Sequence, residues 1–363
     1  QRMDKMQTRI LPHSSTLLRG LRSLRVALDH SVIGQHALKD AMVLALVARE
    51  HLYVEGPPGV AKTRLAESAA RHAGLRPFVY QLHRDTRLHE LIGDALIVRE
   101  RDSAGAELIR QSTRPGGILS AQIAVLDDIS RAPGESLNVL FRILNERRFN
   151  GGGESAELQL PLISAIATGN PCGPDEAYFA ESLDPASLDR FALQVRAHGL
   201  IAEQAWEEAA RVISLNDGGE PAASVPEHHE EAIARALFEA HHLLPSVTLG
   251  EGLRATMIAI VRALAQRLEG EATRAPHLLT DRTFLAKAPL ICRAQALVHG
   301  RVACEADDLY AMRHMTAFRL PARLHEQVDE IIREVIAQRP PSSGPPPPQQ
   351  QQQQQQQQEQ QQQ

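Results

Sequence analysis

The stretch "HLYVEGPPGVAKT", residues 51–63, decides the fold class of this chain. A short apolar strand runs into a loop rich in glycine and proline, and residues 62–73 continue with helical spacing. A loop in this position turns backbone N–H groups and a helix N-terminus toward phosphate oxygens. We therefore expect Lys62 to reach the β- and γ-phosphates of a nucleotide and Thr63 to bind Mg²⁺. The residues expected to bind the nucleotide here are Gly56, Pro57, Pro58, Gly59, Val60, Ala61, Lys62, Thr63 and Arg64.

This loop departs from the strict phosphate-binding pattern at one position. Ala61 stands where that pattern has glycine just before the lysine. The alternative interpretation is a glycine–proline turn that only links a strand to a helix. The Lys62–Thr63 pair and the elements on either side of the loop favour phosphate binding.

Two acids follow a second apolar strand in "AVLDDISR", residues 124–131. Asp127 comes 65 positions after Lys62 (127 − 62). A parallel strand that ends in an acid beside a phosphate loop supplies a Mg²⁺ partner, and the next acid, Asp128, can polarise an attacking water. Two acids at a strand end are by themselves more often a helix N-cap. The upstream loop makes the metal-binding and catalytic interpretation the better one.

Three further residues are weaker candidates. Asn170 ends the apolar run "LISAIATGN" (162–170), where an amide can orient water against the γ-phosphate, although asparagine at a turn is commonly structural. Arg190 in "SLDRF" and Arg282 in "LLTDRTF" are candidate catalytic arginines. The ordinary interpretation of each arginine is a surface ion pair or a solvated helix residue.

The order of strand, glycine loop, helix and strand predicts an α/β fold with a parallel sheet. Residues 95–112 and 147–161 each have two β-prone arms around a turn, so both are expected to be inserted hairpins. Beyond about residue 226 every periodic segment is helical. The expected domains are an N-terminal helix (1–30), an α/β nucleotide-binding core (31–200), a linker (201–225), a helical lid (226–337) and a disordered proline- and glutamine-rich tail (338–363).

Composition excludes several classes of protein. The net charge of −5 and the aromatic content of 4% make a dedicated nucleic-acid binder improbable. The three cysteines are far apart and fit neither a disulfide framework nor a zinc ribbon, so reduced thiols in a cytoplasmic protein are expected. The apolar segment 41–48 is too short to cross a bilayer, and no secretory signal is recognised. The histidine pairs 228–229 and 241–242 lack the spacing of a metal site.

Taken together, these motifs resemble the AAA+ ATPases, and within them the MoxR branch with its RavA-like members in the helix-2-insert clade. The likeness spans about residues 30–320 and rests on "GPPGVAKT", "VLDDISRAPGESLNVLFRILNERRF", "AIATGNP", "SLDRF" and "LTDR". The resemblance implies a ring, usually a hexamer, with ATP between subunits. It assigns Asp127 to Mg²⁺, Asn170 to the first sensor, Arg190 to a finger that reaches a neighbour's ATP, and Arg282 to the lid sensor.

The same resemblance places Ile33, Gly34 and Gln35 near the adenine and makes the two hairpins the clade's insertions, which tend to face the central pore. Such ATPases remodel or activate a target protein together with a partner that carries a von Willebrand factor A domain. One departure matters, because the family usually has glutamate where this chain has Asp128. A shorter carboxylate reaches water less well, so a nucleotide-switched scaffold with little turnover is the alternative. A DNA-translocating relative is disfavoured by the charge balance.

Overall fold

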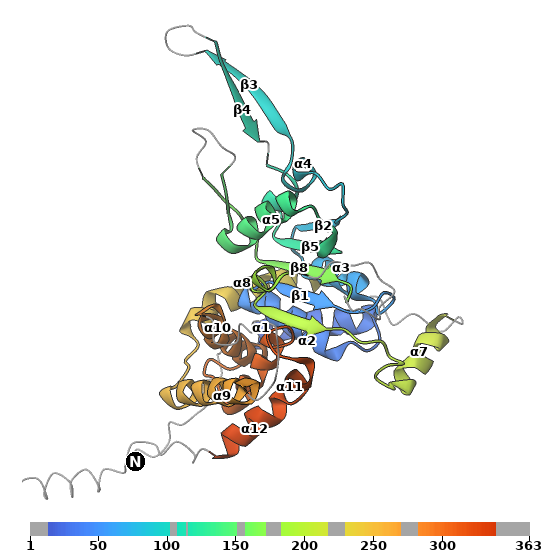
Figure 1. Ribbon diagram of the computed structural model, residues 1–363, viewed down its shortest axis with the longest axis vertical. Coiled ribbons are helices and arrows are strands. Elements are labelled where there is room, and N and C mark those ends of the chain that lie inside the picture. The colour runs from blue at the N-terminus through green and yellow to red at the C-terminus, as the bar shows by residue number, and fades with distance from the viewer. Residues whose placement is uncertain are drawn as a thin grey trace, which may run out of the picture.

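A five-stranded sheet forms the centre of the molecule (Figure 1). The computed structural model describes residues 14–101, 107–113, 115–150, 157–171, 183–216, 229–269 and 282–338. The strand order is β2-β5-β8-β1-β9, and every pairing is parallel. The strands are β1 (Leu52–Glu55), β2 (Pro77–Gln81), β5 (Ile123–Asp127), β8 (Ser164–Gly169) and β9 (Leu193–Arg196). The predicted α/β class is confirmed, although β9 was not predicted.

Helices cover both faces of this sheet. Alternate residues of β5 enter two separate hydrophobic clusters, with Val125 in one and Leu126 in the other. The first cluster is built with α1 (Ser14–Ser31), α2 (His36–Ala48) and α3 (Lys62–His72); the second with α4 (Leu88–Ile92), α5 (Gly134–Glu146) and the 3₁₀ turn η1 (Gly117–Leu119). Burial on both faces explains why β5 and β8 are continuous apolar runs.

Both predicted hairpins are present. β3 (Ala95–Arg101) pairs antiparallel with β4 (Glu107–Thr113), and this hairpin extends away from the rest of the chain in Figure 1. β6 (Arg148–Phe149) pairs with β7 (Leu158–Gln159). The turn residues expected at 103–105 and 151–153 lie outside the described residues.

The C-terminal region is helical, as predicted. It contains α8 (His229–Leu243), η3 (Leu244–Ser246), α9 (Glu251–Glu269), α10 (Arg282–Val298), η4 (Ala306–Met315), α11 (Ala322–Glu326) and α12 (Val328–Gln338). Residues 306–315 form a 3₁₀ helix rather than the expected α-helix. Leu44 of α2 and Ile291 of α10 belong to one hydrophobic cluster, so this region shares its core with the helices of the sheet.

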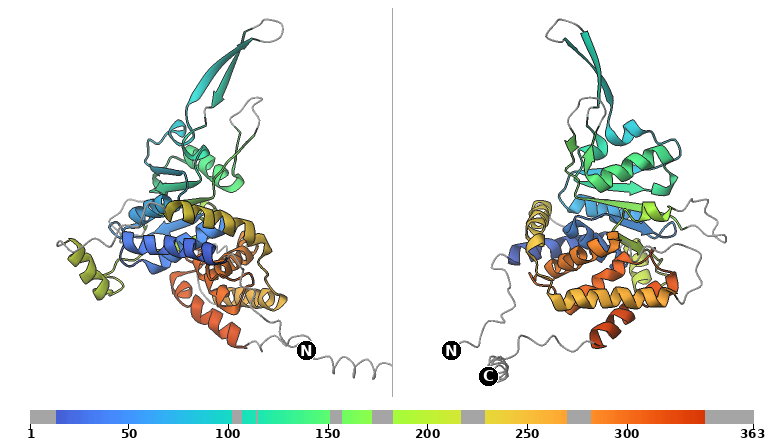
Figure 2. Two further views of the ribbon diagram at one scale, coloured as in Figure 1. Left: turned by 180° about the vertical axis from the view of Figure 1, so that it is seen from behind. Right: turned by 60° about the vertical axis from the view of Figure 1, so that its left-hand side comes forward.

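The expected linker at 201–225 contains a helix that the sequence did not reveal. This helix, α7 (Trp206–Asn216), stands at one side of the molecule, away from α9 (Figures 1 and 2). Residues 217–228 and the predicted tail from residue 339 onward lie outside the described residues. Among the helices that the structure describes, none has the length and apolar character that a membrane-crossing segment requires.

Candidate nucleotide-binding site

The loop between β1 and α3 has a backbone that brings it close to neighbouring strands. Gly56 must be glycine, because a Cβ atom there would lie 2.4 Å from the carbonyl oxygen of Ala197. Ala61 has φ +66°, so it adopts the left-handed conformation that glycine adopts at low cost. The loop therefore keeps a shape suited to glycine although the strict pattern is broken at Ala61.

Lys62 is the first residue of α3; its side chain reaches back into this loop, and it is 7% exposed. Its Nζ donates to the carbonyl oxygens of Gly56 at 2.5 Å and Pro57 at 2.9 Å, and to Oδ1 of Asn170 at 3.2 Å. Burial lowers the pKa of Lys62, and the nearby carboxylates of Asp127 and Asp128 oppose that shift. The predicted phosphate ligand and the predicted sensor thus meet in the folded chain.

Thr63 and Asp127 form the second contact of the site. Thr63 Oγ1 donates to Oδ1 of Asp127 at 2.7 Å, and Thr168 Oγ1 donates to the same oxygen. The backbone N–H of Asp128 donates to Thr168 Oγ1 at 3.2 Å. Hydroxyl and carboxylate oxygens are the donors that Mg²⁺ accepts, so Thr63 and Asp127 fit the metal role assigned to them.

Asp128 is held from two sides. Its backbone is left-handed, with φ +53°. Asn170 Nδ2 donates to Asp128 Oδ1 at 3.0 Å, and Nε of Arg131 lies 3.4 Å from Oδ2. Because the oxygen of the same Asn170 amide accepts from Lys62, a continuous polar chain runs from the loop lysine to Asp128.

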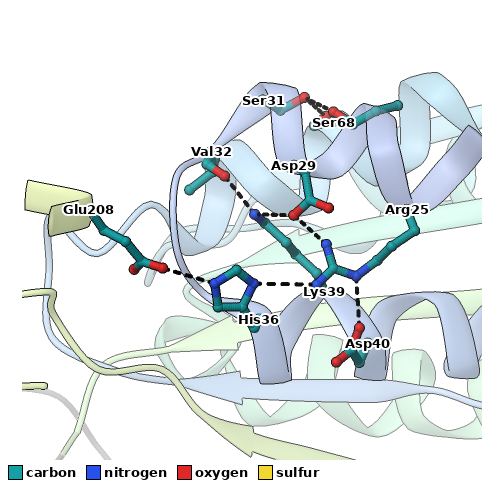
Figure 3. A network of polar contacts seen from close by, with 10 residues as sticks. Arg25, Asp29, Ser31, Val32, His36, Lys39, Asp40, Ser68 and Glu208 are labelled. Atoms are coloured by element: carbon teal, nitrogen blue, oxygen red, sulfur yellow. Dashed lines mark hydrogen bonds and ion pairs between the residues drawn. The ribbon is translucent and has the colours of Figure 1, made fainter. Parts of the chain in front are cut away.

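The turn at residues 33–35 lies against the phosphate loop, where the adenine is expected. Gln35 Nε2 donates to the carbonyl oxygens of Val60 at 3.3 Å and His198 at 2.6 Å. Lys39 stabilises this turn. It is 1% exposed, and its Nζ donates to the carbonyl oxygen of Val32 at 2.6 Å (Figure 3). Gly34 is buried and Ile33 half-buried in this turn.

A cavity of about 690 Å³ borders the loop. Gly56, Pro57 and His198 line it from the sheet side, and Arg313 and His325 line it from the C-terminal helices. The phosphate loop therefore borders a cavity that is lined both by residues at the sheet and by residues of the C-terminal helices.

Sequence reasoning missed two residues of the site. Thr168 is fully buried on β8, and its hydroxyl donates to Asp127. The only feature of the sequence that could have indicated this role is its position two residues before Asn170. Glu55, the last residue of β1, is a carboxylate near Lys62 that helps to keep the lysine charged. Arg64 was assigned to the site and is exposed on the first turn of α3.

The two predicted arginines lie elsewhere. Arg190 Nε lies 3.2 Å from the oxygen of Asn145, in the amide orientation that satisfies both groups. Arg282 begins α10, where Lys287 pairs with Glu50 at 2.5 Å. Glu50 lies just before β1 and the phosphate loop follows β1, so Lys287 of α10 lies at the end of that strand away from the loop. The structure brings neither arginine to the loop of its own chain.

The histidine pairs have no metal-binding geometry where the structure describes them. The His241 ring bonds the carbonyl oxygen of Leu46 at 2.7 Å, and burial lowers the pKa of His241 to about 4. Within the described ranges, no group of three or more histidine, cysteine, aspartate or glutamate side chains is arranged to hold a metal ion. His228 lies outside those ranges.

Comparison with known proteins identifies the family. The family described as "MoxR domain in the MoxR-vWA-beta-propeller ternary systems" matches residues 19–218. The chain belongs to this MoxR family. Chaperone MoxR1 of Mycobacterium tuberculosis is 29% identical over 164 residues, which are 45% of this chain and 40% of that chaperone. The uncharacterized protein YeaC of Bacillus subtilis is 24% identical over 320 residues, 85% of this MoxR chain and 91% of YeaC.

A solved structure shares the fold of this MoxR chain. The crystal structure of a candidate ATPase from Cytophaga hutchinsonii superposes with a TM-score of 0.64 at 19% identity, covering 91% of this chain and 97% of that one. The fold is therefore that of an AAA+ ATPase, with a helical C-terminal region.

Proposed function

We propose that this MoxR chain hydrolyses ATP and uses the cycle to remodel or activate a target protein. The observation that supports the proposal best is the meeting of Lys62, Thr63, Asp127, Asp128 and Asn170 at the carboxyl ends of three adjacent strands. Parallel α/β sheets bind their ligands at this edge.

Each residue has a role in this proposal. The loop N–H groups and Lys62 bind the phosphates, and Thr63 and Asp127 hold Mg²⁺, which when bound neutralises phosphate charge. Asp128 orients the attacking water, with its carboxylate positioned by Asn170. Phosphoryl transfer depends mainly on such positioning and on neutralisation of charge.

The remaining roles require more than one chain. In the proposed hexameric ring Arg190 reaches the ATP of a neighbouring subunit, and Arg282 serves as the lid sensor. The family description names MoxR–vWA–β-propeller systems. The proposed partner is therefore a separate protein with a von Willebrand factor A domain, which recruits the target. Membership of the RavA-like branch and a cytoplasmic location stay predictions.

Phosphate release from the full chain tests the enzymatic part. We expect Mg²⁺-dependent release from ATP that rises when a von Willebrand factor A partner is added. Lys62→Ala is expected to lose ATP binding, whereas Arg190→Ala is expected to keep ATP binding and lose hydrolysis. Undiminished hydrolysis by Lys62→Ala would contradict the proposed site.

Asp128 favours one alternative function, a nucleotide-switched scaffold that binds ATP and assembles with little turnover. Its side chain is one methylene shorter than the usual glutamate and already contacts Asn170 and Arg131. Comparing the wild type with Asp128→Glu separates the two functions. An inert wild type together with an active Asp128→Glu would establish the scaffold; an active wild type would establish the ATPase.

A further inference from the structure

One face of α7 is apolar and exposed. Trp206, Ala210 and Ile213 recur at positions i, i+4 and i+7 and so share one face of the helix. Trp206 is 62% exposed and Ile213 is 70% exposed. Ile201, in the turn that precedes the helix, is 74% exposed. Large apolar side chains gathered on one surface element are typical of a protein–protein interface.

The opposite face of α7 attaches the helix to the body. Glu208 Oε1 lies 2.9 Å from Nε2 of His36, at the start of α2 (Figure 3). A Cβ atom added to Gly34 would lie 2.8 Å from Oε2 of the same glutamate. The helix is therefore anchored by a polar contact beside the turn at 33–35. Val212 and Leu215, on the same face as Glu208, are 36% and 42% exposed; Trp206 and Ile213, on the opposite face, are more exposed and point away from that contact. Most helices in proteins are stabilised by packing of the apolar face.

A matching surface lies on α9. Arg254, Ile258 and Arg262 are spaced by four residues and are all exposed, with Ile258 at 52%. Two arginines thus flank an apolar side chain on α9. Near Trp206, Glu203 lies in the turn before α7 and Glu207 in the first turn of α7. The two surfaces have complementary charge around apolar centres.

The two surfaces are on opposite sides of the molecule. In Figure 1 and in the reverse view of Figure 2, α7 and α9 stand on opposite flanks. They therefore cannot meet within one chain as it is folded. Two different patches on opposite flanks are what a head-to-tail contact between copies requires, and such contacts close into a ring or extend into a filament.

We propose that α7 of one copy docks on α9 of a second copy, with Trp206 and Ile213 packing on Ile258. Glu207 then faces the arginines of α9. The docked copy lies beside the turn at 33–35, because α7 is anchored there. This contact rests on the proposed ring. Because Arg190 needs a neighbouring subunit, loss of the contact lowers hydrolysis but leaves ATP binding by the single chain unchanged.

Cross-linking between single-cysteine variants tests the pairing. The variants Ile213→Cys and Ile258→Cys are purified separately, mixed, oxidised and analysed on a non-reducing gel. The wild type, treated in the same way, gives the background of cross-links formed by the natural cysteines. We expect a cross-linked dimer in the mixture and only the background level in either variant alone. A dimer formed by Ile213→Cys alone, which indicates a symmetric contact, would overturn the proposal, as would a mixture without cross-links.

Charge reversal gives a second readout, by sedimentation velocity of the full chain. Glu207→Arg and Arg262→Glu are each expected to weaken assembly about threefold, and the double variant is expected to restore it. Ile213→Glu should weaken assembly about tenfold or more. Val26→Glu, at a 49% exposed site on α1, is the matched control and should assemble normally. A double variant that assembles no more strongly than the single variants would overturn the proposed pairing of α7 with α9. ATP binding measured in the same samples reports separately on the nucleotide site.

Discussion

Thr63 and Asp127 lie 2.7 Å apart, Oγ1 to Oδ1, although 64 positions separate them in the chain. Thr63 comes from the first turn of α3 and Asp127 from the end of β5. β5 and β1 are separated only by β8 in the sheet, so the carboxyl end of β5 lies near the loop that follows β1. The contact is therefore a direct consequence of parallel strand order.

Removal of either partner should strongly lower Mg²⁺-dependent hydrolysis. We expect Thr63→Ala and Asp127→Asn each to lower kcat/KM by at least about tenfold, equivalent to about 1.4 kcal/mol of transition-state stabilisation. Thr63→Ser keeps the hydroxyl and is the matched control. Phosphate release at several Mg²⁺ concentrations measures the effect. Equal activity of the alanine and serine variants would show that the hydroxyl does not take part.

Much of this site could be predicted, because Lys62, Asp127 and Asn170 each stand at or just beyond the end of an apolar strand. The carboxyl ends of parallel strands share one edge, so such residues converge whatever their separation in sequence. Thr168 was missed because a buried threonine inside a strand looks like any other β-former. Its bond to Asp127 depends on the register of β8 against β5, which only the folded sheet defines.

Two elements were missed for a different reason. β9 is short and reads "LQVR". Two of its four residues, Gln194 and Arg196, are polar, so it lacks the apolar run that marked its neighbours. α7 lies in the segment expected to be a linker. Its large apolar side chains are exposed, so no hydrophobic core among the described residues accounts for its pattern. The position of Arg282 was also beyond prediction, because it depends on how α10 packs along α2.

Ala61 offers a test of the departure in the loop. We expect Ala61→Gly to raise the free energy of unfolding by up to about 1 kcal/mol: a left-handed non-glycine residue costs roughly 1–2 kcal/mol, and glycine gives back about 0.5–1 kcal/mol as unfolded-chain entropy. Ala61→Val should lower it by at least about 1 kcal/mol, because a β-branched residue is poorly tolerated there. Urea denaturation of both variants measures the difference. A marked loss of stability in Ala61→Gly would contradict the strained loop.

Buried histidines should make the chain lose stability in mild acid. His51 is 3% exposed, bonds the carbonyl oxygen of Leu144 and accepts from the N–H of Ala165, and burial lowers its pKa to about 3. The unfolded chain then binds a proton below about pH 6.5 that the folded chain does not. The contribution of neutral His51 to the free energy of unfolding is therefore complete above pH 6.5. It falls as the pH decreases toward 3, by up to about 1.4 kcal/mol per pH unit.

Chemical denaturation at pH 7.5, 6 and 5 measures that slope. His51→Gln should reduce it, because the amide retains hydrogen bonding without titrating. His89→Gln, at an exposed position, is the control and should leave the slope unchanged. The same slope in the wild type and in His51→Gln would show that this imidazole is not the source.

An ion pair between a buried arginine and a partly buried aspartate joins the segment that carries Arg190 to the C-terminal helices. Arg319 is 2% exposed, and its Nη2 lies 3.1 Å from Oδ1 of Asp189, while Nη1 donates to the carbonyl oxygen of Met315 at 2.7 Å. Asp189→Asn leaves a buried guanidinium without its counter-charge, so the free energy of unfolding should fall by about 2–3 kcal/mol. Glu146→Gln, which breaks the exposed pair with Arg142, should cost no more than about 0.5 kcal/mol.

The same variant reports on Arg190, the next residue in the chain. If the Asp189–Arg319 pair positions Arg190, Asp189→Asn should also lower phosphate release at a temperature where the variant is fully folded, while ATP binding stays normal. Folding is checked by circular dichroism at that temperature. Equal losses of stability in Asp189→Asn and Glu146→Gln would contradict the structural part, and unchanged hydrolysis in the folded variant would contradict the positioning of Arg190.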